Sequence, residues 1–328
     1  MASRKPLLLV SSTLKGTPTR TIKFGNFTTL ENARQEQGEA DEVVRRISNL
    51  LKHSNWKPLI ESSDIPYKLT PHLVGSVLRH NRTSSDPTRL LGFFYWCDSR
   101  LGLRQHLQFH SLLALLLCHA RCFPQASSLV QRLIESRRLP LDLLESLVGA
   151  AKELGLDPHD RVAVSSAVFD MVINAYKKLG LLNEASSLLL FVEDGVFLPS
   201  LICCNSLLTD FLRSDMMGLF HRVYYKMLEL KIGPDVYTYT ILIKALCKAG
   251  KVEEANRLLS EMGEKGCSPN VVTYNIVIDG LCRVGALDEA MELKQSMAGR
   301  GLALDSYTFT TLVNGFCRLG RTEEGKWL

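Results

Sequence analysis

Long apolar segments are missing from this sequence of 328 residues. The longest apolar run, around Leu112–Cys118, is far shorter than the ~18 residues that a membrane-spanning helix requires. The 9 cysteines include no Cys-x-x-Cys pair, and Cys118 and Cys122, one helical turn apart, have no second pair nearby. We therefore expect no membrane partner, no metal site and no other cofactor.

Arrangements typical of catalytic sites are also missing. All 8 histidines precede residue 236, and no Ser-His-Asp, metal-ligand or phosphate-loop spacing organises them. The zinc-deaminase signature, His-x-Glu followed by Cys-x-x-Cys, does not occur. The sequence therefore predicts a protein that is not an enzyme and has no small-molecule substrate.

Acidic side chains are missing from residues 1–30, which are basic and rich in Ser and Thr. This composition is typical of an organelle transit peptide, although a merely disordered amino terminus would have the same features. The segment accounts for the whole net charge of +5, whereas residues 166–328 hold 17 basic and 19 acidic side chains. Bulk charge is therefore no evidence for a nucleic-acid partner.

What the sequence does contain is a repeat of 35 residues. Residues 236–270 align with 271–305 without a gap, a third copy begins at Ser306, and 201–235 and 166–200 fit the same frame. The identities between the first two include Tyr239/Tyr274, Ile243/Ile278, Leu246/Leu281, Gly250/Gly285, Glu254/Glu289, Ala255/Ala290, Met262/Met297 and Gly266/Gly301. The cysteines that mark one position of this repeat rather than a metal site are Cys247, Cys282 and Cys317.

Each repeat has the pattern of two helices. In residues 271–305, Tyr274 and Ile278 belong to an apolar stripe with helical spacing, and Gly285 then ends the helix in a left-handed conformation. Glu289 lies in the first turn of a second helix, where negative charge is favourable. Because so small a unit cannot bury its own apolar face, neighbouring repeats must stack. The sequence therefore predicts an all-α fold, an α-solenoid of 35-residue helix-turn-helix repeats.

The run VVTYNIVIDGLCRVGALDEAMELKQSM resembles a pentatricopeptide repeat of the P subfamily, of plant organellar type, whereas the Trp-x-x-Leu-Gly run of tetratricopeptide repeats is absent. The resemblance is specific across 236–328, good across 166–235 and weaker across 72–141. It implies repeats stacked into a right-handed superhelix that binds single-stranded RNA, about one base per repeat.

The expected organisation follows the repeat frame. A helix is predicted at Glu39–His53, where Val43, Ile47 and Leu50 form an apolar stripe. The expected segments are a transit peptide (1–30), a helical and linker region (31–71), two degenerate repeats (72–141), an insertion with one helix (142–165), four full repeats (166–200, 201–235, 236–270, 271–305) and one truncated repeat (306–328).

The resemblance implies that RNA bases are read by residues 5 and 35 of each repeat and sandwiched by residue 2. The implied reading pairs are Asp170/Ser200, Asn205/Asp235, Thr240/Asn270 and Asn275/Asp305, with Thr310 lacking its partner. The implied sandwiching residues are Ile202, Tyr237, Val272 and Tyr307. Helix capping explains the residues at position 35 without a ligand. Asn and Thr at position 5 are mediocre helix formers, which favours base contact there.

Basic residues form a second series with the same spacing. They are Lys178, Arg213, Lys248, Arg283 and Arg318. Cations in the last turn of a helix are favoured by its dipole, so this series has a structural explanation. We also expect these residues to contact RNA phosphates along the concave face.

By the family's preferences, Asn with Asp resembles a uridine reader and Thr with Asn an adenosine reader, so residues 201–305 are expected to prefer U-A-U. The expected function is binding of organellar transcripts by occupancy, for their stability, processing, splicing or translation, with other RNA-processing proteins as possible partners. The alternative is a scaffold that binds protein in its groove. The leader and the FFYW segment favour a mitochondrial location over a plastid one.

Overall fold

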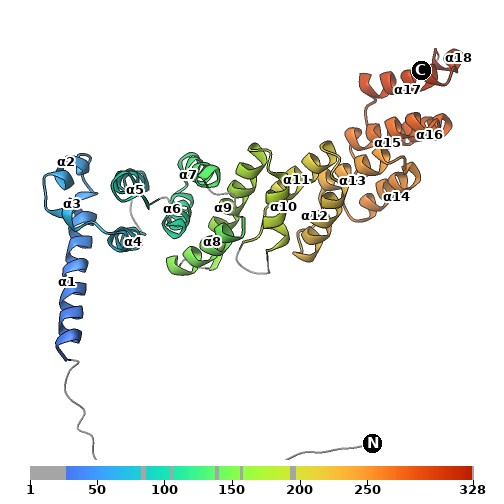
Figure 1. Ribbon diagram of the computed structural model, residues 1–328. Coiled ribbons are helices and arrows are strands. Elements are labelled where there is room, and N and C mark those ends of the chain that lie inside the picture. The colour runs from blue at the N-terminus through green and yellow to red at the C-terminus, as the bar shows by residue number, and fades with distance from the viewer. Residues whose placement is uncertain are drawn as a thin grey trace, which may run out of the picture.

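The computed structural model describes residues 27–82, 86–103, 106–136, 140–155, 158–192 and 197–326, and all regular secondary structure in these ranges is α-helical. The predicted transit peptide lies outside them apart from residues 27–30, which begin the first helix. Within the described ranges, no helix has the length and apolar character that crossing a membrane requires. The prediction of an α-solenoid is confirmed: the helices follow one another in an elongated row (Figure 1).

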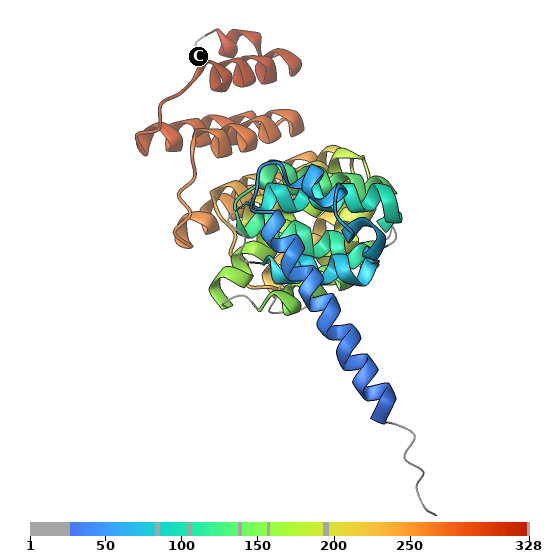
Figure 2. The ribbon, with the colours of Figure 1, turned by 90° about the vertical axis from the view of Figure 1, so that its left-hand side faces the viewer.

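The amino-terminal helices precede the regular repeats. They are α1 (Phe27–Leu50), α2 (Trp56–Glu61), α3 (Ile65–Lys68), α4 (Pro71–His80), α5 (Pro87–Leu101), α6 (Leu107–His119), α7 (Phe123–Ser136) and α8 (Pro140–Leu154). Helix α1 begins twelve residues before the predicted start at Glu39, and Figure 2 shows its first turns projecting away from the body. Its second half packs on α4 through Val43, Val44 and Ile47.

The carboxy-terminal helices form successive hairpins. They are α9 (Pro158–Lys178) with α10 (Leu182–Leu190), α11 (Leu201–Arg213) with α12 (Met217–Glu229), α13 (Val236–Lys248) with α14 (Val252–Glu264), α15 (Val271–Val284) with α16 (Leu287–Gly299), and α17 (Ser306–Arg318) with α18 (Thr322–Gly325). As predicted, Gly285 ends α15 in the left-handed conformation, with φ of 89°. Residues 180, 250 and 320, which are all glycines, are left-handed at the same repeat position.

The boundary predicted at residue 166 falls inside a helix. Helix α9 begins at residue 158, and its early residues Val164 and Ser165 are buried against the body. No glycine or proline interrupts the sequence between Pro158 and Lys178, so nothing stops the helix at the expected start of the repeat. The first full repeat therefore carries an extended first helix.

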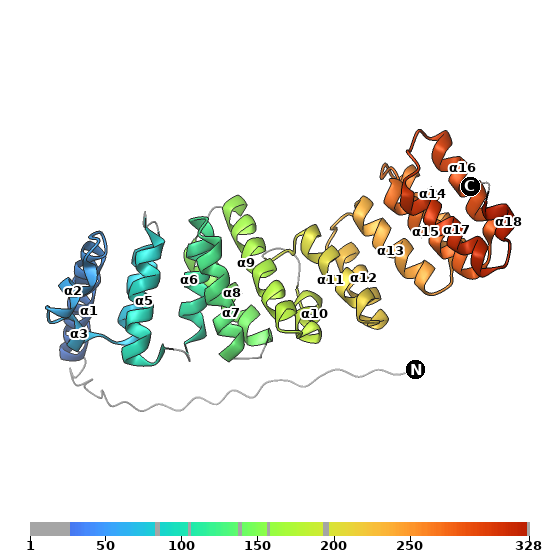
Figure 3. The same ribbon diagram turned by 90° about the horizontal axis from the view of Figure 1, so that it is seen from above.

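Helix α8 changes how the helices alternate. Contacts join α7, α9, α11 and α13 in one row, and α4, α6, α8, α10 and α12 in another (Figures 1 and 3). Because α8 is one helix rather than a hairpin, it shifts the alternation by one helix. As a result, α6, the first helix of the degenerate repeat 107–141, lies in the row that holds the second helices of later repeats.

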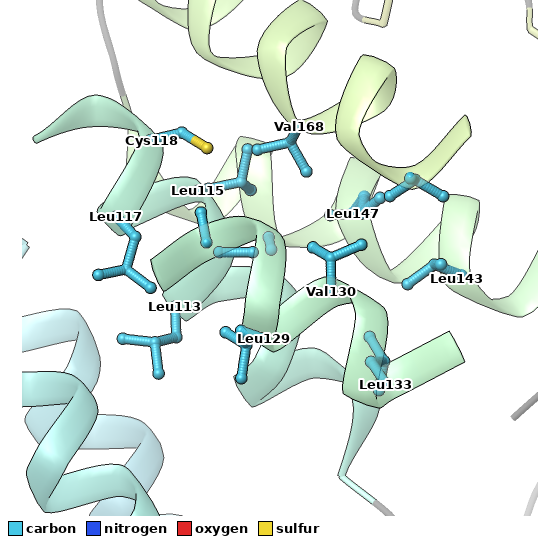
Figure 4. Packing of buried hydrophobic residues seen from close by; sticks show 14 of the residues in the cluster. Leu113, Leu115, Leu117, Cys118, Leu129, Val130, Leu133, Leu143, Leu147 and Val168 are labelled. Carbon is cyan, nitrogen blue, oxygen red and sulfur yellow. The ribbon is translucent and has the colours of Figure 1, made fainter. Parts of the chain in front are cut away.

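The core changes character along the row. Figure 4 shows α6, α7, α8 and α9 meeting through leucine and valine side chains, among them Leu115, Val130, Leu147 and Val168. Residues 109–118 of α6 are buried without exception, because neighbouring helices cover all of its faces. The core of the last repeats is a separate cluster built from the repeated positions, such as Tyr274 and Ile278.

Candidate nucleic-acid interface

Position 35 of each repeat caps the following first helix. The side-chain oxygens of Ser200, Asp235, Asn270 and Asp305 accept hydrogen bonds from the backbone N–H groups three residues later. Each thereby satisfies an N–H group that the helix itself leaves without a partner. The capping explanation for these residue types is confirmed, and it fixes each side chain at the junction between two repeats.

Position 5 is buried in three successive repeats. Asn205, Thr240 and Asn275 are only 3%, 9% and 5% exposed. Each polar group at such a site needs a partner within the protein. The first helix of the next repeat packs over this position. Only Thr310 is exposed, and its hydroxyl donates to the Ser306 carbonyl at 2.7 Å.

Two of the proposed reading pairs are joined directly. Asn205 Nδ2 donates to Asp235 Oδ1 at 3.1 Å, and Asn275 Nδ2 donates to Asp305 Oδ1 at 3.2 Å. In the first repeat, the backbone N–H of Ser200 donates to Asp170 Oδ1 at 3.0 Å. The structure therefore brings residues 5 and 35 together at these three repeat junctions.

A third residue, at position 3 of the following repeat, completes each junction. Thr238 Oγ1 lies 2.8 Å from both Asn205 Oδ1 and Asp235 Oδ1. Thr308 repeats this arrangement beside Asn275, at 2.7 Å from its Oδ1. We call these groups junction triads. Their members are Asn205/Asp235/Thr238, Thr240/Asn270/Thr273 and Asn275/Asp305/Thr308.

The middle triad is connected differently. Thr273 Oγ1 lies 3.0 Å from Thr240 Oγ1 and 3.0 Å from Asn270 Oδ1. The described side chains of Thr240 and Asn270 have no direct hydrogen bond with each other. Sequence reasoning missed the position 3 threonines, although their spacing of 35 residues was visible. Cys203 occupies this position in the first junction and has no hydroxyl group.

The two acidic members of the triads are held in their ionised form. Desolvation opposes ionisation of Asp235, but hydrogen bonds from Thr238 and Asn205 lower its pKa below the usual value. The backbone N–H and hydroxyl of Thr308 likewise lower the pKa of Asp305, with a smaller contribution from Asn275. Both carboxylates can therefore only accept hydrogen bonds at neutral pH.

Position 2 carries exposed apolar side chains. Ile202 is 81% exposed, and the following members are Tyr237 at 54%, Val272 at 59% and Tyr307 at 56%. These four side chains lie outside the apolar core. They form a regular series beside the junction triads, one per repeat.

The basic series lies in the last turns of the first helices, as both explanations require. All five side chains are exposed. Lys248 Nζ donates to the Leu212 carbonyl at 3.1 Å and to Asp215 at 2.8 Å, so it also ties two repeats together. Arg283 pairs with Asp279 at 2.8 Å on its own helix. Such exposed pairs are weak and leave the cations available to an anion.

Two of the repeated cysteines, Cys247 and Cys282, serve as packing residues at the interfaces between hairpins, whereas Cys317 is exposed. Burial raises the pKa of the Cys247 and Cys282 thiols to about 11. Cys247 faces Gly280 and Cys282 faces Gly315 so closely that a Cβ atom on either glycine would lie under 3 Å from the sulfur. Among the described residues, no group of three or more His, Cys, Asp or Glu side chains could hold a metal.

Family models match the part of the chain that holds the regular hairpins. A model described as "PPR repeat family" matches residues 199–248, 241–283 and 269–318, and one described as "PPR repeat" matches 167–191. A mitochondrial pentatricopeptide repeat-containing protein of Arabidopsis thaliana is 34% identical over 212 residues, which cover 65% of this chain and 21% of the relative. A chloroplastic one is 33% identical over 190 residues, covering 56% and 22%.

Solved structures give a fold-level comparison. The crystal structure of PPR10 from maize matches with a TM-score of 0.45 and 20% identity, covering 83% of this chain and 40% of that one. PPR10 in complex with an 18-nucleotide psaJ RNA element matches with a TM-score of 0.43 and 21% identity, covering 77% and 42%. The chain thus spans less than half the length of each of these four proteins.

Proposed function

Because the chain belongs to the pentatricopeptide-repeat family, we propose that it binds single-stranded RNA along the first helices of residues 166–328. In this proposal each repeat contacts one base, as such repeats do. The bound RNA is an organellar transcript, since relatives of similar identity carry mitochondrial and chloroplastic names. The protein acts by occupying its target rather than by catalysis, and we place it in the mitochondrion before the plastid.

The observation that carries this proposal is the regular placement of three kinds of side chain. An exposed apolar residue at position 2, a polar junction triad and an exposed cation at position 13 recur every 35 residues. An apolar side chain can stack against the face of a base, a polar triad can bond its edge, and a cation can contact the phosphate.

The test is binding to a randomised pool of single-stranded RNA, followed by sequencing of the retained fraction. The expected result is enrichment of a U-A-U core through Asn205/Asp235, Thr240/Asn270 and Asn275/Asp305. Exchanging Asn275 for Thr should change the base enriched at one end of that core. A folded, helical sample that retains no RNA would contradict the proposal and favour a protein-binding groove.

A matched pair of tyrosine substitutions distinguishes base contact from non-specific RNA binding. Tyr237, at position 2 of α13, and Tyr225, on the second helix α12, are both exposed. Tyr237→Ala should weaken binding by about 5-fold to 100-fold, since stacking contributes roughly 1–3 kcal/mol per base. Tyr225→Ala should leave the affinity unchanged. Equal losses in the two variants would count against the proposed face.

A further inference from the structure

We propose that Thr238, Thr273 and Thr308 are specificity-determining residues that hold the base-reading side chains of the preceding repeat in one hydrogen-bonding orientation. This inference rests on the proposed function and adds a positioning residue to each reading pair. The threonines act through their neighbours, because each is fully or almost fully buried and touches the residues at positions 5 and 35.

The chemistry of the triad leaves the asparagine amide one consistent orientation. An ionised carboxylate can only accept, so the amide group that faces Asp305 must be Nδ2, which donates at 3.2 Å. The amide oxygen of Asn275 is then turned toward Thr308, whose hydroxyl lies 2.7 Å from it and 2.8 Å from Asp305 Oδ1, so the single hydroxyl hydrogen is shared between these two acceptors. The carboxylate and the hydroxyl therefore anchor opposite ends of the amide.

Two anchors matter because an amide can otherwise present either end. Each amide nitrogen carries two hydrogens and each amide oxygen two lone pairs, so one of each remains after the triad bonds are made. With the amide held, the free hydrogen and the free lone pair lie at fixed places. If the Thr308 hydroxyl is removed, Asn275 Oδ1 faces a methyl group while it is buried, and the amide gains by rotating toward other partners.

The middle triad depends on its threonine even more. Thr240 donates its hydroxyl hydrogen to the Val236 carbonyl at 2.7 Å, so toward Thr273 it acts as an acceptor. Thr273 lies between Thr240 and Asn270, which have no direct hydrogen bond in this described junction, and its single hydroxyl hydrogen is shared between the Thr240 hydroxyl and Asn270 Oδ1. Loss of the Thr273 hydroxyl would remove the hydrogen-bonded connection between Thr240 and Asn270, the two proposed readers of one base.

Capping and orientation can be separated by substitution. The helix cap uses the backbone N–H of Thr308, which donates to Asp305 Oδ1 at 2.8 Å and is retained in any variant. Thr308→Val removes only the hydroxyl at nearly constant volume, and Thr308→Ser keeps it. Thr311, a buried threonine of the same helix outside the triads, gives the matched control Thr311→Val.

The experiment is selection from a randomised single-stranded RNA pool with the full chain, its Thr308→Val, Thr308→Ser and Thr311→Val variants, and Thr238→Val as a second site. In Thr308→Val we expect the preference at the base read by Asn275 to fall roughly three- to tenfold. The preference at the base read by Asn205 should stay unchanged in the same molecules. Thr308→Ser should restore the wild-type pattern, and Thr238→Val should shift the loss to the other base.

The outcomes distinguish the inference from the function on which it rests. If the wild-type chain selects a core and Thr308→Val selects it equally well, the positioning role is wrong. An equal loss at every base, or an equal loss in Thr311→Val, would also overturn it, because that pattern reports general destabilisation. If the wild-type chain selects no sequence at all, the proposed function fails first. Should Thr308→Val not fold, Thr238→Val decides the question by the same criteria.

Discussion

The amino-terminal region, α1 to α8, and the repeats from α11 to α17 bury their side chains through different kinds of contact. The first buries an aromatic group in which the Trp56 and Phe93 rings lie 6.2 Å apart and the Trp96 indole donates to Glu61. The second uses the same few contacts at each junction, such as Asn275 with Thr308. Contacts that are not repeated can cover a helix on all sides, as residues 109–118 of α6 show.

Repeated contacts have a different consequence. Since every junction of the later repeats uses the same repeat positions, the side chains that are not needed for packing also recur at a constant spacing. A polymer with one unit per repeat can then meet an equivalent set of positions at each step. A regular binding face therefore requires regular interfaces beneath it, and the amino-terminal region lacks these interfaces.

The largest effect should come from breaking the amino-terminal core. Phe94 is fully buried and its ring lies 4.8 Å from that of His110. Phe94→Ala should lower the free energy of unfolding of this region by about 3–5 kcal/mol. Stacked repeats contact only their neighbours, so hydrogen exchange in α13 to α17 should be unaffected. Equal loss of protection throughout the chain would show that the two regions unfold as one unit.

Removing a cap should have a smaller effect, confined to one junction. Asp235 accepts from the backbone N–H and the hydroxyl of Thr238 and from Asn205. Asp235→Ala should destabilise the protein by about 1–2 kcal/mol in chemical denaturation. Asp235→Asn keeps a capping oxygen, as Asn270 does naturally, and should recover most of the loss. No difference between the two variants would contradict the capping assignment.

Two glycines differ in how closely the neighbouring hairpin packs against them. A Cβ atom at Gly315 would lie 2.8 Å from the Cys282 sulfur, whereas at Gly149 of α8 nothing lies within 4 Å. Gly315→Ala should lower the midpoint of denaturation, with a cost of about 1–2 kcal/mol from overpacking. Gly149→Ala should raise it by up to about 1 kcal/mol, because alanine favours the helix. Similar effects at both sites would mean that the cysteine–glycine contact is loose.

The smallest effect concerns two carboxyl groups whose pKa values are lowered by different causes. Lys68 and Arg46 lower the pKa of Asp64 to about 2, whereas desolvation opposes the lowered pKa of Asp235, which comes from uncharged hydrogen-bond donors. Raising the salt concentration from about 0.1 M to about 1 M shortens the Debye length from about 10 Å to about 3 Å. NMR titration should then show the pKa of Asp64 rising more than that of Asp235.

The lowered pKa values also fix the sign of the pH dependence. A carboxyl group with a depressed folded pKa stabilises the protein above its unfolded pKa, near 3.9, and this contribution is lost as the pH falls through the folded value. Acid unfolding of the Asp235→Asn/Asp305→Asn double variant should therefore be less steep below pH ~4 than that of the wild type. If the double variant and the wild type lose stability equally steeply below pH ~4, carboxylates other than Asp235 and Asp305 cause the acid unfolding.

Much of the repeat region was predictable because its determinants are local. The periodic apolar residues, the left-handed Gly285 and the capping types of Asp235 and Asn270 each depend on a few neighbouring residues, and all were found where expected. The row in which α6 lies was not predictable in the same way. It depends on α8, whose contacts with α6 and α10 join separate hairpins of the chain.

The helical period, the caps, the stacking of hairpins and the residues that recur every 35 positions could all be predicted from the sequence, because a repeat of 35 residues states each of these several times over. The burial of position 5 and its contact with the threonine at position 3 of the next repeat became visible only in the packed hairpins. That contact joins residues 33 positions apart, as between Asn205 and Thr238. Its existence depends on how closely two hairpins approach, which no single repeat specifies.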